Sequence, residues 1–175
     1  MTNSKVVIVS GMGGSGKTTV VRELAKNYTN SKCLFFDDYD IDVLPSAPSL
    51  YTPIQSAVNQ YDISALLEDL KMAYGNYAYL FVDFPFGYKH KSIKAIIDKV
   101  IYVKTPLDIC FARRLLRDFK DETSSSIKSM TEHYLNFGRS IFIDYENFVI
   151  QEVDLIVDGT LAINTNIEII KNNLL

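Results

Sequence analysis

The apolar residues of this chain gather in short runs, which alternate with longer segments in which apolar residues recur every three or four positions. The first run, Lys5 to Ser10, is continuous and rich in β-branched residues, as expected of a strand buried on both faces of a sheet. Similar runs predict strands at residues 34–36, 79–82, 100–103 and 155–157. Strands that alternate with helical segments are typical of a parallel sheet covered by helices, so the pattern predicts an α/β fold.

Helical spacing predicts helices at residues 17–27, 90–98, 127–149 and 166–174. A further helix is expected to begin with Asp62 as its N-cap and to reach about residue 70, and another to begin at Pro106. We expect the apolar stripe of the longest helix to pack in the core. This stripe consists of Ile127, Met130, Tyr134, Phe137, Ile141, Tyr145 and Phe148. Residues 39–59, with three prolines, are predicted to form a loop, and the polar, serine-rich residues 121–126 a mobile connection.

The composition indicates one ordinary globular domain over residues 1–175, with a hydrophobic fraction of 47% and a charged fraction of 22%. The formal net charge of −3 argues against a nucleic-acid partner and favours a small phosphorylated metabolite. No apolar stretch approaches the ~18 residues of a membrane span, so we expect no membrane partner and a cytoplasmic location. Cys33 and Cys110 are far apart and are expected to be buried, reduced thiols.

The strongest chemical signal is the glycine-rich sequence at residues 11–18, GMGGSGKT, which follows a predicted strand and opens a predicted helix. Glycines let successive backbone N–H groups point at one phosphate. In this motif the lysine, Lys17, reaches the β- and γ-phosphates, and the hydroxyl of Thr18 binds Mg²⁺. We therefore predict a site for ATP and Mg²⁺. The expected nucleotide-binding residues are Gly11, Gly13, Gly14, Ser15, Gly16, Lys17, Thr18 and Thr19, with Arg114 from a later helix.

Acidic residues follow two of the predicted strands, Asp37 and Asp38 after one and Asp83 after another. Ligands of parallel α/β sheets bind beyond the carboxyl ends of the strands, so these carboxylates are expected to face the γ-phosphate. Phosphoryl transfer needs one carboxylate to accept the proton of the acceptor hydroxyl and another to hold magnesium. Taken alone, an aspartate after a strand is more often part of a solvated turn or a helix cap, but the neighbouring phosphate loop favours a role at the site.

Three arginines lie close together on the helix that follows Pro106, namely Arg113, Arg114 and Arg117. Arg113 and Arg117 are four residues apart and share one helix face. We expect these two to close over the transferring phosphoryl group and neutralise its charge, with Arg114 as a substitute. The alternative is a solvated basic face paired with nearby aspartates.

These segments together resemble the uridine kinase family of P-loop kinases, with the nicotinamide riboside kinases as relatives. The resemblance is carried by residues 6–19, 34–39, 61–71, 112–118, 133–134 and 154–157. It implies a P-loop NTPase fold, a three-layer sandwich with a central five-stranded parallel sheet and a short helical lid at about residues 113–128. It also implies that Asp37, ahead of Asp38, is the catalytic base and that Asp83 lies near the metal.

The sequence departs from this family at positions that concern the acceptor. The lid tip reads Lys-Asp-Glu-Thr-Ser at residues 120–124, without the arginines usual there, and Ser56 replaces an acidic residue that holds ribose hydroxyls. No Tyr- and His-containing segment that recognises a pyrimidine lies between residues 71 and 79, and residues 84–88 read Phe-Pro-Phe-Gly-Tyr. Kinase chemistry is therefore a firmer prediction than uridine specificity.

The leading hypothesis is a kinase that transfers the γ-phosphate of ATP to a hydroxyl of a small, nucleoside-like acceptor, with Lys17, Asp37, Arg113 and Arg117 as catalytic residues and Thr18 and Asp83 at the metal. One alternative is a kinase of a sugar, vitamin or other non-nucleoside metabolite. Another is a regulatory nucleotide-binding protein, although the guanine-reading pattern Asn-Lys-x-Asp is absent. The long aromatic helix could also supply a surface for a homo-oligomer.

Overall fold

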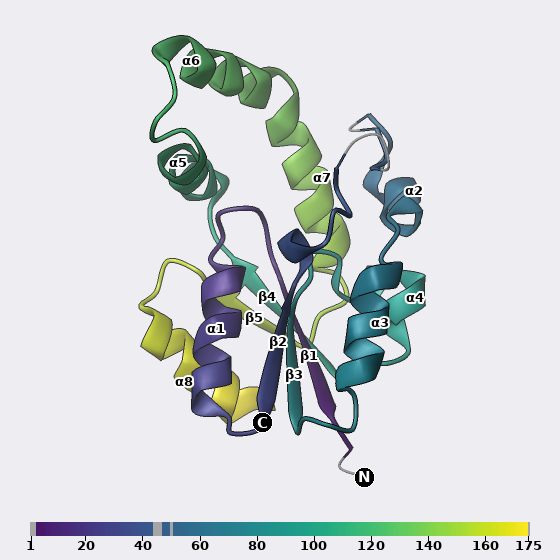
Figure 1. Ribbon diagram of the computed structural model, residues 1–175. Helices are drawn as coiled ribbons and strands as arrows, with labels where there is room; N and C mark the ends of the chain where they lie inside the picture. Colours follow the sequence, from purple (N-terminus) through teal and green to yellow (C-terminus); the bar gives the residue numbers. More distant parts are fainter. Residues whose placement is uncertain (1–2, 44–46, 50, 175) are drawn as a thin grey trace.

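The computed structural model describes residues 3–43, 47–49 and 51–174. Within them, five strands form one parallel sheet in the order β2-β3-β1-β4-β5 (Figure 1). The strands are β1 (Lys5–Ser10), β2 (Ser31–Phe35), β3 (Tyr79–Asp83), β4 (Lys99–Lys104) and β5 (Leu155–Asp158). Because β1 lies in the middle, residues 6–9 are fully buried. The predicted five-stranded parallel sheet is confirmed.

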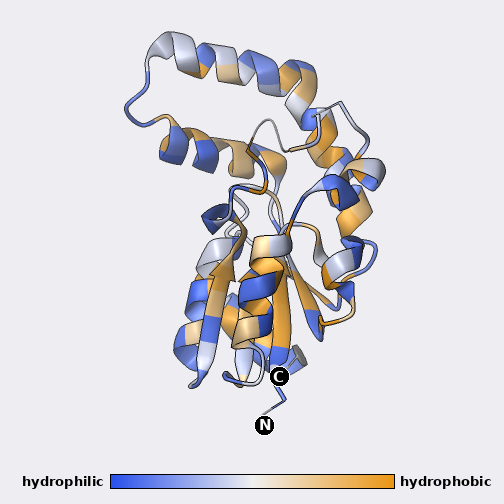
Figure 2. Cartoon of the chain, turned by 45° about the vertical axis from the view of Figure 1, so that its right-hand side comes forward, coloured by the Kyte–Doolittle hydropathy of each residue, from blue (hydrophilic) through white to orange (hydrophobic). Residues whose placement is uncertain are grey.

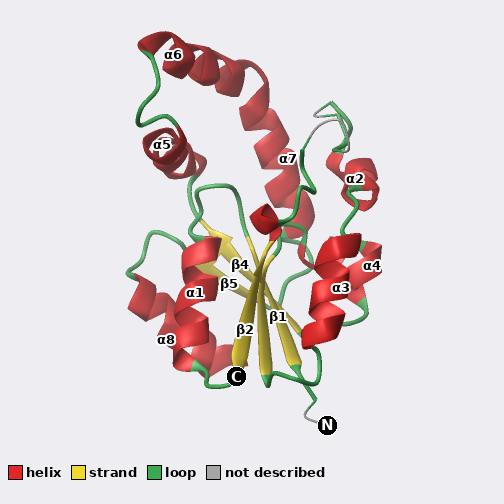
Figure 3. Ribbon diagram, viewed as in Figure 1, coloured by secondary structure: helices red, strands yellow, loops and turns green. Residues whose placement is uncertain are grey.

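Helices cover both faces of the sheet, which completes the predicted three layers (Figure 3). The helices are α1 (Lys17–Asn27), α2 (Ile54–Ala57), α3 (Ser64–Ala73), α4 (Lys91–Lys94), α5 (Leu107–Asp118), α6 (Ser124–His133), α7 (Arg139–Val149) and α8 (Ile163–Leu174). Helices α1 and α8 pack on one face around Val7, Val9 and Phe81. On the other face, α3, α4 and α7 pack around Val6 and Ile8.

Helices α5 and α6 form an arm above the carboxyl ends of the strands (Figure 1). Figure 2 shows the contrast in composition, with apolar strands inside and a largely polar or neutral α6 outside. No residue of α6 is buried. The predicted lid region thus corresponds to the end of α5, the turn that follows it and the start of α6.

Three short elements differ from the predicted boundaries. Strand β2 begins at Ser31 and not at residue 34, because the polar start of this edge strand still pairs through its backbone with β3. The predicted helix at residues 90–98 shrinks to α4, since Asp98 instead binds the backbone of Val6 and starts the turn into β4. Helix α3 begins at Ser64, whose N–H binds the carboxylate of Asp62.

The long helix predicted at residues 127–149 is interrupted. A π-helix, η4 (Tyr134–Gly138), separates α6 from α7, and its wider turn shifts the apolar stripe around the helix axis. Tyr134 and Tyr145 are buried, but Ile127 is 37% exposed and Phe137 is 46% exposed. The expectation that the whole stripe packs in the core is therefore wrong for these last two residues. Residues 124–126 also belong to α6 and not to a connection.

Further elements consist of single turns, η1 (Phe36–Asp38), η2 (Val58–Gln60) and η3 (Gly87–Lys89). The predicted loop at residues 39–59 thus contains α2 and part of η2. Both cysteines are free, although only Cys110 is fully buried. Among the described residues, no helix has the length and apolar character needed to cross a bilayer.

Candidate active site

The glycine-rich loop connects the end of β1 to the start of α1 and lies tightly against β4 and α5. Gly14 adopts a left-handed φ of 87°, and a Cβ atom there would lie 2.4 Å from the backbone oxygen of Cys110 in α5. A Cβ at Gly11 would lie 2.8 Å from the backbone oxygen of Val103. Glycine is therefore required at these positions both by backbone conformation and by space.

Asp83 lies beside this loop because β3 neighbours β1, with Val9 and Asp83 in register. The carboxylate is almost fully buried, and its Oδ2 accepts a hydrogen bond of 2.5 Å from the Thr18 hydroxyl. The Nζ of Lys17 lies 3.7 Å from Oδ1, which is an ion pair but too long for a hydrogen bond. Burial raises the pKa of Asp83, and the charge of Lys17 and the Thr18 hydroxyl partly oppose this shift.

The oxygen atoms around Thr18 and Asp83 fit a magnesium ion. Oδ1 of Asp83 is buried without a hydrogen-bond partner, and such an oxygen next to a hydroxyl suits a hard cation. No group of three or more His, Cys, Asp or Glu side chains arranged for a metal exists in the described part of the chain. Magnesium held here would therefore take its remaining ligands from phosphate groups and water, as is usual for this ion.

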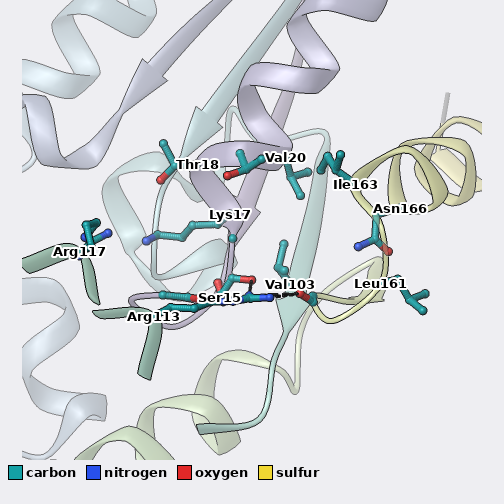
Figure 4. Close-up of a pocket in the computed structure, with 14 residues that line it drawn as sticks. Ser15, Lys17, Thr18, Val20, Val103, Arg113, Arg117, Leu161, Ile163 and Asn166 are labelled. Atoms are coloured by element: carbon teal, nitrogen blue, oxygen red, sulfur yellow. Dashed lines mark hydrogen bonds between the residues drawn. The ribbon is translucent and has the colours of Figure 1, made fainter. Parts of the chain in front are cut away.

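A first cavity, of about 350 Å³, opens along the glycine loop (Figure 4). One wall is formed by residues 14–20, and the opposite wall comes from the β5–α8 connection and the start of α8, with Leu161, Ile163 and Asn166. Apolar side chains facing a phosphate-binding loop can accommodate the base of a nucleotide. No motif in the sequence indicated this second wall. Its only signal is its position after the last parallel strand, at the carboxyl edge of the sheet.

Arg113 lies at this first cavity and binds backbone atoms. Its Nη1 donates to the oxygens of Gly14 and Ser15, each at 3.4 Å, and both Nη atoms donate to Gly159 O at 3.2 Å. Thr105 also donates to Ser15 O, at 2.9 Å. These bonds connect α5, the glycine loop and the β5–α8 connection.

A second cavity, of about 430 Å³, lies on the other side of Lys17. Lys17 and Arg117 line both cavities, so the two cavities meet at these cationic groups. Asp37 lines the second cavity, whereas Asp38 is not among its lining residues. A hydrogen bond from Arg117 to Asp118 holds the pKa of Arg117 above its ordinary value, with a further contribution from the charge of Asp37.

The structure thus separates the three arginines of α5. Arg113 borders the first cavity, Arg114 borders the second, and Arg117 borders both. The guanidinium of Arg114 lies 5.6 Å from the ring centre of Phe142. Arg114 was expected to bind the nucleotide, but it borders the second cavity and not the first. The residues brought together around Lys17 are Thr18, Asp37, Asp83 and Arg117.

Tyr145 is a site residue that the sequence pattern indicated only as part of a core stripe. Its buried hydroxyl donates its one hydrogen to the backbone oxygen of Pro85, with the backbone oxygen of Gly11 at 3.5 Å as a second, weaker acceptor, and its side chain lines the second cavity. Asp42 lines the same cavity and was also missed. Both lie in segments without a local motif, so no sequence signal identified them.

Comparisons with known proteins agree on one group of enzymes. The family model described as "Phosphoribulokinase / Uridine kinase family" matches residues 70–165, more than half of the chain. The uridine kinase of Staphylococcus haemolyticus is 29% identical, over 78% of each chain. That of Staphylococcus carnosus is 26% identical, over 90% of this chain and 88% of the relative.

Solved structures share the fold at lower identity. A chain described as a fructose transport system kinase from Silicibacter has a TM-score of 0.66 and 14% identity, with 90% of this chain and 91% of that one covered. Deoxyadenosine kinase from M. mycoides has a TM-score of 0.56 and 19% identity, with 97% and 98% covered. Shikimate kinase from Aquifex aeolicus has a TM-score of 0.56 and 14% identity, with 97% and 95% covered. These similarities show that the chain shares the fold of these proteins.

Proposed function

This chain belongs to the Phosphoribulokinase / Uridine kinase family, and we propose that it is a magnesium-dependent kinase that transfers the γ-phosphate of ATP to a hydroxyl of a nucleoside-like acceptor. The observation that carries this proposal is the meeting of two cavities at Lys17 and Arg117. The glycine loop borders the first cavity, as a donor nucleotide requires. A carboxylate, that of Asp37, borders the second, as an acceptor hydroxyl requires.

In the proposed reaction, the acceptor oxygen attacks the γ-phosphorus and its proton passes to the carboxylate of Asp37. The bond between the γ-phosphorus and the oxygen that bridges to the β-phosphate breaks, and ADP leaves. Lys17 and Arg117 stabilise the negative charge of the transferring group where the two cavities meet. Magnesium bound next to Thr18 and Asp83 would supply further positive charge to the phosphates.

Arg113 has a different part in this proposal. Its guanidinium is engaged with three backbone oxygens, so it holds the glycine loop in place rather than reaching the γ-phosphate. Arg114, which borders the second cavity, acts on the acceptor side. Transfer then depends mainly on positioning and charge neutralisation, because phosphoryl transfer asks for little covalent chemistry from the protein. Two free thiols agree with the reducing cytoplasm that we propose as its location.

The test measures ADP release from ATP and Mg²⁺ with a panel of nucleosides, sugars and vitamins as acceptors. We expect one class of acceptor to stimulate release strongly, and Lys17→Ala to abolish the stimulation. Asp37→Asn should lower kcat by at least about 100-fold, the usual contribution of a general base, while ATP affinity stays within about twofold. Asp38→Asn is the matched control and should retain activity.

Near wild-type transfer by Asp37→Asn would show that Asp37 is not the base. Uniformly slow ADP release with tight nucleotide binding, whatever the acceptor, would contradict the kinase proposal. It would then favour a regulatory nucleotide-binding protein.

A further inference from the structure

A third cavity, of about 440 Å³, lies between α7 and the segment that contains α2. Its lining is unusually rich in aromatic side chains. These are Tyr51, Tyr61, Phe86, Phe137, Phe142 and Tyr145. The volume is within the range of small-molecule sites. We call this space the aromatic cavity.

The aromatic cavity adjoins the proposed acceptor site. Phe142 and Tyr145 line both the aromatic cavity and the second cavity, in which Asp37 lies. Tyr145 is held in place by the hydrogen bond from its hydroxyl to the backbone oxygen of Pro85. The two cavities are therefore neighbours, and a ligand that spans both would place a hydroxyl beside Asp37 and another part of itself among the aromatic rings.

The rings of this cavity belong to different segments of the chain. The ring of Tyr61 lies 4.9 Å from that of Phe86, centre to centre, at an angle of 33°. Tyr51 meets Phe137 edge to face at 6.4 Å, although the two side chains are 78% and 46% exposed. Aromatic side chains that remain exposed in this way offer their faces to a flat ligand, on which such rings stack favourably.

The π-helix accounts for the position of Phe137. Its extra residue per turn turns Phe137 away from the core face that the helical spacing predicts, and Phe137 faces Tyr51 and the aromatic cavity. Leu135, on the same π-helix, lines a different hollow between α5 and α6. Insertions of this kind occur often at functional sites.

The charges of the cavity restrict its ligand further. Among the described residues that line it, there is no lysine, arginine or histidine, and the carboxylate of Asp144 gives it a negative charge. A negatively charged group would lose its hydration here without gaining a cationic partner. A ring with N–H donors at its edge would instead find acceptors in Asp144, Ser49 and Thr52.

We propose that the aromatic cavity binds the ring of the acceptor, a planar nitrogen heterocycle that carries N–H donors and no negative charge. This inference rests on the proposed function, because it takes the hydroxyl beside Asp37 as the group that is phosphorylated. It goes beyond that function by assigning the recognition of the acceptor to Tyr51, Phe137 and Asp144.

The experiment is calorimetric titration of the full-length protein, saturated with Mg²⁺ and a non-hydrolysable ATP analogue. The titrants are uridine, cytidine, adenosine, ribose, which has no ring base, and orotidine, which is uridine with a carboxylate on the ring. We expect at least one of the three uncharged nucleosides to bind about tenfold or more tightly than ribose. We expect orotidine to bind at least about tenfold more weakly than uridine.

Phe137→Ala should weaken binding of the tightest nucleoside by about tenfold, the usual loss for a stacking side chain, and should leave affinity for the ATP analogue within about twofold. Leu135→Ala is the matched control, because Leu135 is 67% exposed on the same π-helix and does not line the aromatic cavity. It should bind the nucleoside as the wild type does. Both side chains are partly or largely exposed, so neither variant is expected to disturb folding.

Three results would overturn the inference: no nucleoside binds better than ribose, orotidine binds as well as uridine, or Phe137→Ala and Leu135→Ala are indistinguishable. A parallel assay of phosphorylated product separates this inference from the proposed function. Efficient phosphorylation of a sugar without ring-dependent binding would refute the inference and leave the kinase chemistry intact. Ring-dependent binding that is lost in Phe137→Ala, without any phosphoryl transfer, would support the inference and refute the proposed reaction.

Discussion

The contact between the glycine loop and α5 can be measured with one pair of substitutions, Gly14→Ala and Gly16→Ala. Both glycines have left-handed backbones, with φ of 87° and 102°. They differ in their surroundings, because a Cβ at Gly14 would lie 2.4 Å from the backbone oxygen of Cys110, whereas a Cβ at Gly16 would have no atom within 4 Å. The pair therefore separates backbone strain from steric conflict.

The expected magnitudes follow from this difference. A Cβ on a left-handed residue costs about 1–2 kcal/mol, and both variants bear this cost. Gly14→Ala must in addition displace a backbone oxygen of a helix, which cannot rotate away as a flexible side chain would. Overpacking of this kind costs about 1–3 kcal/mol. For a chain of this size, each kcal/mol lowers Tm by about 2–4 °C, so Gly14→Ala should melt about 2–12 °C below Gly16→Ala.

The assay is thermal unfolding followed by circular dichroism in the absence of nucleotide, so that lost phosphate binding does not affect the result. Wild type, Gly14→Ala and Gly16→Ala are compared at one protein concentration. Equal Tm values for the two variants would refute the reasoning, because they would show that the glycine loop does not pack against α5 as closely as described.

Further predictions concern pH, an internal hydrogen bond and magnesium. Burial lowers the pKa of His90 below 6.5, opposed by its hydrogen bond to Tyr61 O, so the folded state favours the neutral ring. The contribution of His90 to stability should therefore be constant above about pH 6.5 and fall as the pH drops below it, and His90→Gln should remove this contribution in urea denaturation between pH 7 and 5. Tyr145→Phe leaves the buried backbone oxygen of Pro85 without its donor and should lower the free energy of unfolding by about 1–3 kcal/mol, and a loss below about 0.5 kcal/mol would contradict this. Thr18→Val should raise the Mg²⁺ concentration for half-maximal rate by about tenfold or more, whereas Thr18→Ser should not, and equal effects would exclude a role for the hydroxyl.

The sequence alone predicted the elements whose signals are local. The continuous apolar run of β1, the glycine pattern and the start of α1 lie within residues 5–27, and the structure confirms each boundary. Asp83 was predicted to lie beside the loop because it ends a strand, and it contacts both Lys17 and Thr18. Such inferences succeed because parallel strands must present their carboxyl ends at a common edge.

Other features depended on contacts between distant segments. Helical spacing placed Arg113 and Arg117 on one face, but only the packing of α5 against the loop decided that Arg113 binds backbone oxygens and that Arg117 borders two cavities. No local motif marks the cavity wall at residues 159–166 or the place of Tyr145 in the site. The wall forms because β5 pairs with β4, and Tyr145 reaches the site because α7 packs against the face of the sheet that contains Val6 and Ile8 of β1.

The division between sequence and tertiary structure is sharpest in the helix predicted at residues 127–149. Its apolar period correctly predicted a helical segment, because side-chain spacing reports local backbone geometry. The same period could not reveal the π-helix, in which Phe137 is turned toward Tyr51 although Tyr134, from the same stripe, is buried. The sequence thus determined the phosphate-binding loop and the sheet that presents it, since both follow from local patterns. Only the tertiary structure decided the shape and charge of the acceptor side, because it is built from segments that meet through folding.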